Sequence, residues 1–75
     1  MADDKLVYPK GERVMVGYID HNKELKYIIT CKEVRDYYFL YERSGNEFKK
    51  LGKAKEPTQL ELKFNIFEKM GWKLD

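Results

Sequence analysis

The 75-residue chain has one cysteine, one histidine and one tryptophan, and these scarcities exclude several classes of protein. A lone Cys31 cannot form an internal disulfide, the usual stabiliser of small secreted domains. One cysteine and one histidine cannot complete a four-ligand zinc site. No run approaches the roughly 18 apolar residues of a membrane span, and the polar start of the chain is not a signal peptide. The sequence therefore predicts a soluble, cytoplasmic protein with no cofactor, no metal and no membrane partner.

No arrangement of residues in the sequence predicts catalysis. The glycine-rich phosphate-binding motifs are absent, and the 13 acidic residues are scattered along the chain. His21 stands beside Asp20, but both fall in a short turn, which seldom forms a pocket for acid–base chemistry. Cys31 shares a strand face with apolar residues, and its neighbour Lys32 points to the opposite side of the strand, so we expect a buried structural thiol. The protein is therefore predicted not to be an enzyme.

Charged and aromatic residues are abundant, in contrast to these scarce types. Charged residues make up 37% of the chain, against roughly 25% in an average protein, and their signs nearly balance at a net charge of +2. Aromatic residues reach 15%, and such large rings build a core from few positions. We expect one small domain over residues 11–75 and a flexible N-terminal arm over residues 1–10. In that arm Leu6, Val7 and Tyr8 either add a short edge strand or pack over the core.

The first half of the domain has the pattern of a β-hairpin. From Arg13 to Ile19, apolar residues occupy both faces of the expected strand, which indicates a central strand covered on two sides. Residues 20–23 form a polar break, and a second strand is expected from Leu25 to Lys32. Strict alternation places one set of side chains from this second strand on a single face: Leu25, Tyr27, Ile29 and Cys31.

A second hairpin follows in the sequence. A third strand is expected from Tyr37 to Arg43, then a turn over residues 44–47, where glycine and asparagine accept positive φ angles. A short fourth strand is expected from Phe48 to Lys53. Alternation divides the third strand between two faces, with Tyr37, Phe39 and Tyr41 on one and Tyr38 and Leu40 on the other.

The C-terminal segment carries both strand and helix signals. Polar and apolar residues alternate from Gln59 to Asn65, which is a strand pattern. Thr58 and Glu61 have the spacing of a capping box after Pro57, and Gly71 stands where a helix C-cap belongs. Helical spacing also aligns Leu60, Phe64 and Phe67 on one face. We favour a helix over residues 58–70, after which Trp72 and Leu74 fold back onto the sheet.

These elements predict an α+β fold, a four-stranded antiparallel meander with one C-terminal helix laid across a face. One face of such a meander must be covered if this many aromatic residues are to be buried. The alternative is an all-β, five-stranded small barrel of SH3-like type, in which Gly11 to Val14 begin the first strand.

The end of the chain resembles a family of small bacterial domains of unknown function. The family's helix–Gly-Trp–strand ending follows roughly the pattern L-N-x-L-G-x-x-G-W-x-L, and the resemblance covers 11 residues of this chain. It departs at Glu68, where the family has glycine, and the family continues into another strand. The resemblance implies a small bacterial α+β domain and no activity. The matching positions are Asn65, Gly71, Trp72 and Leu74, with Phe64 and Phe67 in apolar slots.

Basic residues gather in the second half of the sequence. Residues 1–47 hold 8 basic and 9 acidic residues, whereas residues 48–75 hold 7 basic and 4 acidic residues. The densest group is Lys49, Lys50, Lys53 and Lys55. Lysine on an edge strand blocks unwanted pairing, which is the plainer interpretation, and a basic stripe is also typical of proteins that bind nucleic acid or acidic proteins.

The aromatic surplus is where the sequence indicates a function. Rings left over after the core is packed favour a non-enzymatic protein-interaction module of bacterial or phage origin, acting on a protein partner or by self-association as a homodimer. The alternative is a weak nucleic-acid-binding module, in which exposed rings stack on bases and lysines contact phosphates. The residues of the predicted interaction surface are Tyr37, Tyr38, Tyr41, Arg43, Lys49, Lys50, Lys53, Lys55 and Trp72.

Overall fold

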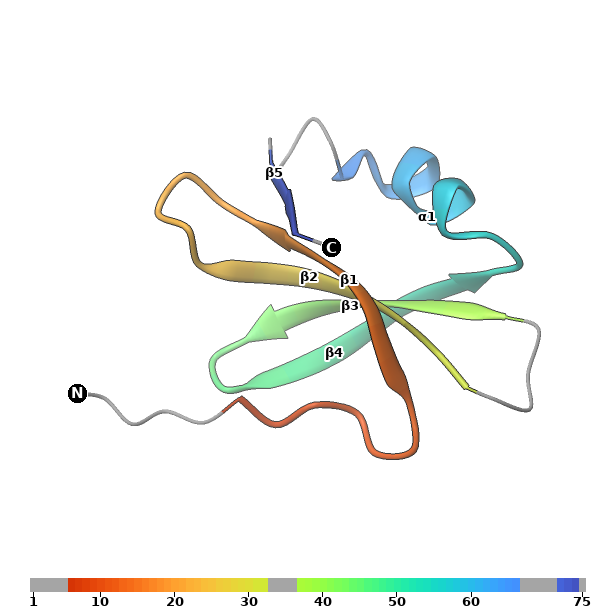
Figure 1. Ribbon diagram of the computed structural model, residues 1–75, viewed down its shortest axis with the longest axis horizontal. Helices are drawn as coiled ribbons and strands as arrows, with labels where there is room; N and C mark the ends of the chain where they lie inside the picture. The colour runs from red at the N-terminus through yellow and green to blue at the C-terminus, as the bar shows by residue number, and fades with distance from the viewer. Residues whose placement is uncertain (1–5, 33–36, 67–71, 75) are drawn as a thin grey trace.

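The computed structural model describes residues 6–32, 37–66 and 72–74, which contain one sheet and one helix (Figure 1). An antiparallel meander is formed by β1 (Arg13–Ile19), β2 (Leu25–Cys31), β3 (Tyr38–Ser44) and β4 (Glu47–Ala54). The helix α1 (Pro57–Phe64) follows, and then the short strand β5 (Trp72–Leu74). The predicted α+β meander with a C-terminal helix is therefore confirmed.

The fifth strand extends the sheet beyond the meander. β5 pairs with β1, so the order across the sheet is β4-β3-β2-β1-β5, with β4 at one edge. The expected return of the C-terminal segment is confirmed for the backbone, since Trp72 is opposite Ile19 and Leu74 is opposite Gly17. The all-β barrel alternative is wrong, because residues 57–64 are helical and Gly11 and Glu12 precede β1.

Polar side chains and one glycine close the two hairpins of the meander. Between β1 and β2, the Asp20 carboxylate accepts the backbone N–H groups of Asn22 and Glu24 at 2.9 and 3.0 Å. The N–H of Glu24 lowers the pKa of Asp20 from its usual value, because it stabilises the ionised carboxylate. Between β3 and β4, Gly45 adopts a φ of 65°, a conformation that glycine takes without a steric cost.

A bulge in the first hairpin changes the face of one predicted core residue. Tyr18 is opposite Tyr27, but the next pair is Ile19 with Leu25, so Lys26 is an extra residue in β2. Leu25 therefore packs with Ile28 instead of sharing a face with Tyr27, and the predicted grouping was wrong for Leu25. Because side chains alternate with a period of two, one extra residue reverses the face of everything beyond it.

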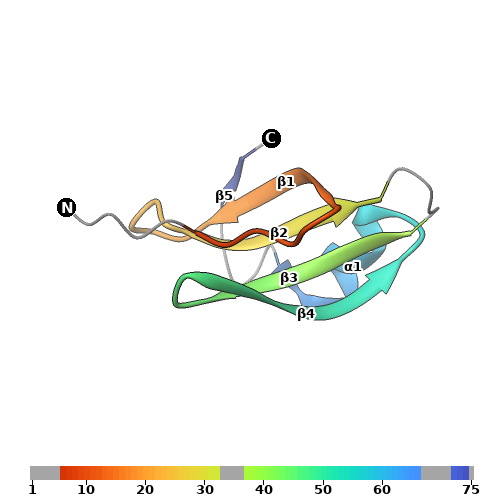
Figure 2. The same ribbon diagram turned by 90° about the horizontal axis from the view of Figure 1, so that it is seen from below.

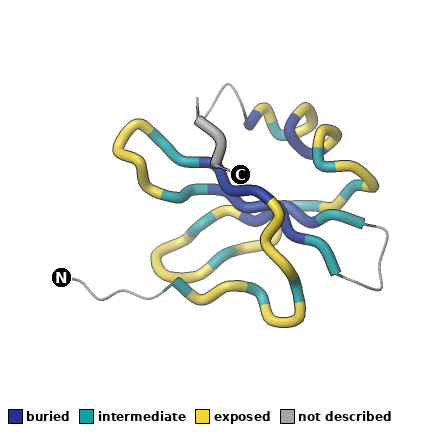
Figure 3. The backbone as a smooth tube through the Cα atoms, viewed as in Figure 1, coloured by how far each residue is buried: buried dark blue, intermediate teal, exposed yellow. Residues whose placement is uncertain are grey.

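A second bulge, at Met15, leaves the start of β1 uncovered. Val14 is opposite Thr30 and Val16 is opposite Ile29, so Met15 has no partner of its own in the register. Val14 and Met15 are exposed, whereas burial is concentrated where β1, β2 and β3 cross (Figure 3). The expectation of cover on both sides of β1 therefore holds only from Val16 to Tyr18.

The helix begins and ends differently from the sequence prediction. Glu56 is the N-cap and makes no side-chain capping hydrogen bond, so the capping box of Thr58 and Glu61 was wrong. Pro57 fits the first turn of a helix because its fixed φ suits that position. The helix ends at Asn65, which adopts a left-handed conformation, six residues before the expected cap at Gly71. Residues 67–70 of the predicted helix lie outside the described residues.

The helix covers one face of the sheet, and a buried polar contact fastens it there. The Tyr18 hydroxyl donates a hydrogen bond to Glu61, and both residues are buried. Gly52 of β4 leaves room for the Phe64 ring, since a Cβ atom at this position would lie 3.0 Å from it. The buried apolar residues of this core are Val16, Tyr18, Tyr27, Ile29, Leu40, Leu60 and Ile66.

Replacing Tyr18 with phenylalanine tests this contact. The substitution removes a hydrogen-bond donor to a buried carboxylate, which costs about 1–3 kcal/mol. We expect Tyr18→Phe to lower the free energy of unfolding by that amount in urea denaturation. We expect the double variant Tyr18→Phe/Glu61→Leu to recover part of the loss, because both polar groups are then absent. Equal stability of Tyr18→Phe and the wild type would show that the contact does not hold α1.

Candidate functional site

The face of the sheet opposite α1 carries the candidate site. Figure 2 looks onto this side, which we call the open face, with α1 behind the sheet and the N-terminal segment in front of β2. A second apolar cluster lies here without contribution from the helix. Its members are Ile28, Phe39 and Tyr41, which are buried, and Leu25, Tyr37 and Phe48, which are half-buried.

The N-terminal segment is held against β4 at the edge of this face. The backbone N–H of Val7 donates to the Asn46 carbonyl oxygen at 2.7 Å, and Val7 forms a parallel bridge with Glu47. The Tyr8 ring stacks on the Phe48 ring, with centroids 5.3 Å apart. Residues 6–8 were expected either to add a short edge strand or to pack over the core. Val7 makes a backbone bridge at the sheet edge and Tyr8 packs its ring on Phe48, so the segment is fixed at two points.

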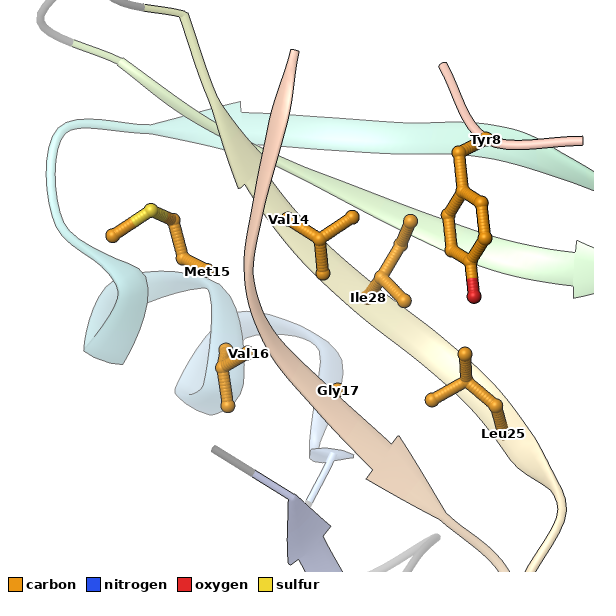
Figure 4. A pocket seen from close by; sticks show the side chains of 7 residues that line it. All are labelled: Tyr8, Val14, Met15, Val16, Gly17, Leu25 and Ile28. Carbon is orange, nitrogen blue, oxygen red and sulfur yellow. The ribbon is translucent and has the colours of Figure 1, made fainter.

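An apolar pocket of about 310 Å³ lies between the N-terminal segment and the first hairpin (Figure 4). The side chains of Val14, Ile28 and Leu25 lie on the same side of β1 as Tyr8, whereas Met15 and Val16 extend to the other side. Val14 is 41% exposed and Tyr8 is 44% exposed, so apolar groups line an opening that solvent reaches. The lining contains no charged side chain and consists of Tyr8, Val14, Met15, Val16, Gly17, Leu25 and Ile28.

Lysine side chains cover the aromatic rings on the other half of the open face. The Lys50 Nζ atom lies 4.4 Å from the Phe39 ring centroid and 5.8 Å from that of Tyr41. The Lys53 Nζ atom lies 4.8 Å from the Tyr37 ring centroid. Two further lysines lie farther from the same rings, Lys32 over Phe39 at 5.8 Å and Lys55 over Tyr37 at 6.0 Å. Cations over ring faces are attracted to them by about 0.5–1 kcal/mol at exposed sites.

A buried carboxylate joins the two halves of the face. The side chain of Glu12 is 6% exposed and accepts the Thr30 hydroxyl at 2.6 Å and the Tyr41 hydroxyl at 2.8 Å. The Lys32 ammonium lies 3.9 Å from the same carboxylate. Burial, together with the hydrogen bond to Glu12, raises the pKa of Tyr41 far above its usual value of 10.0, because the anionic phenolate would be desolvated beside a carboxylate.

The structure brings together part of the predicted interaction surface. Tyr37, Tyr41, Lys50, Lys53 and Lys55 meet on the open face. β4 is an edge strand, as its lysines suggested.

Of the other predicted surface residues, one shares the open face and three lie elsewhere. Tyr38 packs against the core under α1, and Lys49 is opposite Glu42 on the α1 side of β4. Arg43 is opposite Phe48 and so on the open face, where its guanidinium donates from Nε to the Gly45 carbonyl oxygen at 2.8 Å. Trp72 is in β5, at the sheet edge away from β4. Strand alternation puts Tyr38 and Lys49 on the α1 side of the sheet, and strand order puts Trp72 at the opposite edge, so these three residues do not join the others.

Sequence reasoning missed the pocket and the Glu12 cluster. The bulges at Met15 and Lys26 create the pocket's shape, and no residue pattern marked them. Glu12 joins Thr30 and Tyr41 across 18 and 29 positions of sequence, so only the folded sheet reveals the group. The signal that could have drawn attention to the pocket is Val14 and Leu25, apolar residues near strand ends.

The residues considered for catalysis lie apart from this face. His21 is exposed in the β1–β2 turn, and Cys31 is a free, half-buried cysteine at the end of β2, less covered than expected. Within the described ranges, no group of three or more metal-ligating side chains occurs. None of the described helices is long and apolar enough to cross a membrane.

Comparisons of the chain with protein-family profiles, with curated protein sequences and with solved structures gave no match. The resemblance of the C-terminal segment to small bacterial domains therefore stays a prediction. Among its matching positions, Asn65 ends α1 and Trp72 begins β5.

The Tyr41–Glu12 hydrogen bond gives stability a defined dependence on pH. A tyrosine whose pKa is raised on folding contributes stability that is present below its unfolded pKa of 10.0 and lost as the pH rises above it. We expect Tyr41→Phe to be about 1 kcal/mol less stable than the wild type at neutral pH. The difference should shrink over the range from about pH 10 upward. Urea denaturation across this range measures it, and a difference that stays constant with pH would contradict the assignment.

Proposed function

We propose that this domain is a protein-interaction module whose open face binds an extended segment of a partner protein, with an apolar side chain of that segment in the pocket. The observation that carries the proposal is the combination of an uncovered apolar pocket with partly exposed Val14 and Tyr8 at its rim. Filling such a pocket removes apolar surface from water at about 25 cal/mol per Å².

The shape and lining of the pocket support a side chain as its occupant. Its volume of about 310 Å³ is at the small end of the range for ligand sites, roughly 300–1,000 Å³. Its lining offers the Tyr8 hydroxyl but no charged group to orient a polar ligand. Aromatic and aliphatic anchors entering apolar pockets provide most of the affinity of protein interfaces.

The positions of the aromatic rings favour protein binding over the alternative of nucleic-acid binding. Phe39 and Tyr41 are each only 6% exposed, and the Lys50 ammonium lies over both rings. Bases stack on exposed ring faces, so stacking here would require lysine side chains to move away first. Contacts between lysines and phosphates that involve no stacking would show a steep salt dependence in the experiments below.

Selection from a random peptide library displayed on phage tests the proposal. We expect enriched peptides to share an aliphatic or aromatic residue. We expect Val14→Glu to weaken their binding about tenfold or more, because it places a charge at the mouth of an apolar pocket. The matched control is Leu62→Glu, at an exposed leucine on α1 whose side chain is 76% exposed, and it should leave binding unchanged.

Three results would contradict the proposal. One is a selection that enriches no sequence, and another is binding that responds to Leu62→Glu but not to Val14→Glu. The third is a dimer that forms through this face. Light scattering would then give twice the monomer mass for the wild type and the monomer mass for Val14→Glu. That result would make a second copy of the chain the natural occupant.

A further inference from the structure

A continuous row of residues crosses the open face from the pocket to the lysines. Gly17 in β1 is opposite Ile28 in β2, Ile28 is opposite Tyr41 in β3, and Tyr41 is opposite Lys50 in β4. Gly17 and Ile28 line the pocket, whereas the Lys50 ammonium stands over the Phe39 and Tyr41 rings. A ligand lying across the strands would therefore meet first an apolar pocket and then cationic groups.

The sheet geometry sets the distance between these two regions. Neighbouring strands lie about 4.8 Å apart, so the backbone of Ile28 and that of Lys50, two strands away, are separated by roughly 10 Å. An extended peptide advances about 3.3 Å per residue. A segment with one side chain in the pocket would therefore place a residue about three positions away beside Lys50.

The acidic side chains that the structure describes do not neutralise the lysines on the open face. By strand alternation, Glu42 and Glu47 lie on the α1 side of β3 and β4, as Lys49 does. Glu12 is on the open face, but its carboxylate is already occupied by Thr30, Tyr41 and Lys32. In the described part of the chain, no ion pair is formed by Lys50, Lys53 or Lys55.

The rings beneath the lysines hold these cations over the sheet face. Lys50 and Lys53 lie within 5 Å of a ring centroid, at 4.4 Å from Phe39 and 4.8 Å from Tyr37. Their side chains extend over β3 instead of outward from the sheet edge. A carboxylate arriving on the face would meet charges already positioned there, which reduces the entropy lost on binding.

We propose that the partner segment carries aspartate or glutamate about three residues from the apolar residue that enters the pocket, and that Lys50, with Lys53 and Lys55 beside it, binds these carboxylates. This inference rests on the proposed function and adds the chemistry of the partner. The occupant is thus an acidic segment with an apolar anchor, and complementary charge is the argument for it.

The peptides from the phage-displayed random library test the spacing. We expect Asp or Glu to be enriched two to four positions from the shared apolar residue. A synthetic copy of the tightest peptide with these acids replaced by Asn or Gln should bind roughly fivefold more weakly at low salt. The difference should narrow at high salt, because screening weakens exposed charge pairs.

Charge reversal in the domain supplies the matched test. We expect Lys50→Glu to weaken binding of the acidic peptide roughly fivefold or more and to leave binding of the Asn/Gln copy nearly unchanged. The control is Lys63→Glu on α1, where the Lys63 ammonium also lies over a ring, 5.7 Å from the Phe64 centroid. It changes net charge equally on the other side of the sheet and should not alter binding.

The outcomes separate this inference from the function on which it rests. The acidic-segment proposal would be overturned if the selected peptides need Val14 for binding but carry no acidic residues. It would also be overturned if Lys50→Glu and Lys63→Glu weaken binding equally. Both results would leave the proposed interaction module unaffected. A selection that yields no pocket-dependent peptide would overturn both proposals. A further result would assign the lysines to nucleic-acid binding instead. In that case the domain binds single-stranded oligothymidylate, Lys50→Glu abolishes this binding, and no acidic peptide binds.

Discussion

A helix of eight residues can cover only one face of a five-stranded sheet, and the rest of the structure depends on this constraint. α1 is fastened to its face by the buried contact between Tyr18 and Glu61 and by the close fit of Phe64 against Gly52. The opposite face must shield its apolar residues by other means. It does so with lysine stems, whose methylene groups cover rings while their charges stay in water, and with the N-terminal segment held by Tyr8. This cover is incomplete, and the pocket is the part left open.

The fold was largely predictable because its signals are local. The period-two alternation of apolar residues predicted the strands of the meander. It also correctly assigned Phe39 and Tyr41 of β3 to one face of the sheet and Leu40 to the other. The Gly45 turn was also marked by residue type, since it requires a positive φ. The helix end was less predictable. Asn65 and Gly71 are both suitable C-caps, and the choice between them depends on packing that the sequence does not show.

The candidate site was only partly predictable, for reasons of geometry. Tyr37, Tyr41, Lys50 and Lys53 were predicted from the sequence to share one surface, but the position of the lysine side chains over the rings was not predicted. The pocket depends on bulges that shift the strand register by one residue. The pattern of apolar and polar residues does not show where these bulges occur. Tyr38 was misassigned to the surface because a dense run of aromatic residues on one strand must divide between two faces, and only one of them is open.

We propose that partner proteins bind on the sheet face away from α1. Amide NMR shift mapping with the tightest selected peptide tests it most directly. We expect the shifted amides to belong to residues of the pocket and to the lysines beside it, such as Gly17, Ile28 and Lys50, and the amides of Leu62 and Lys63 to be unchanged. Shifts confined to α1 and to the strand residues beneath it would contradict binding on the open face.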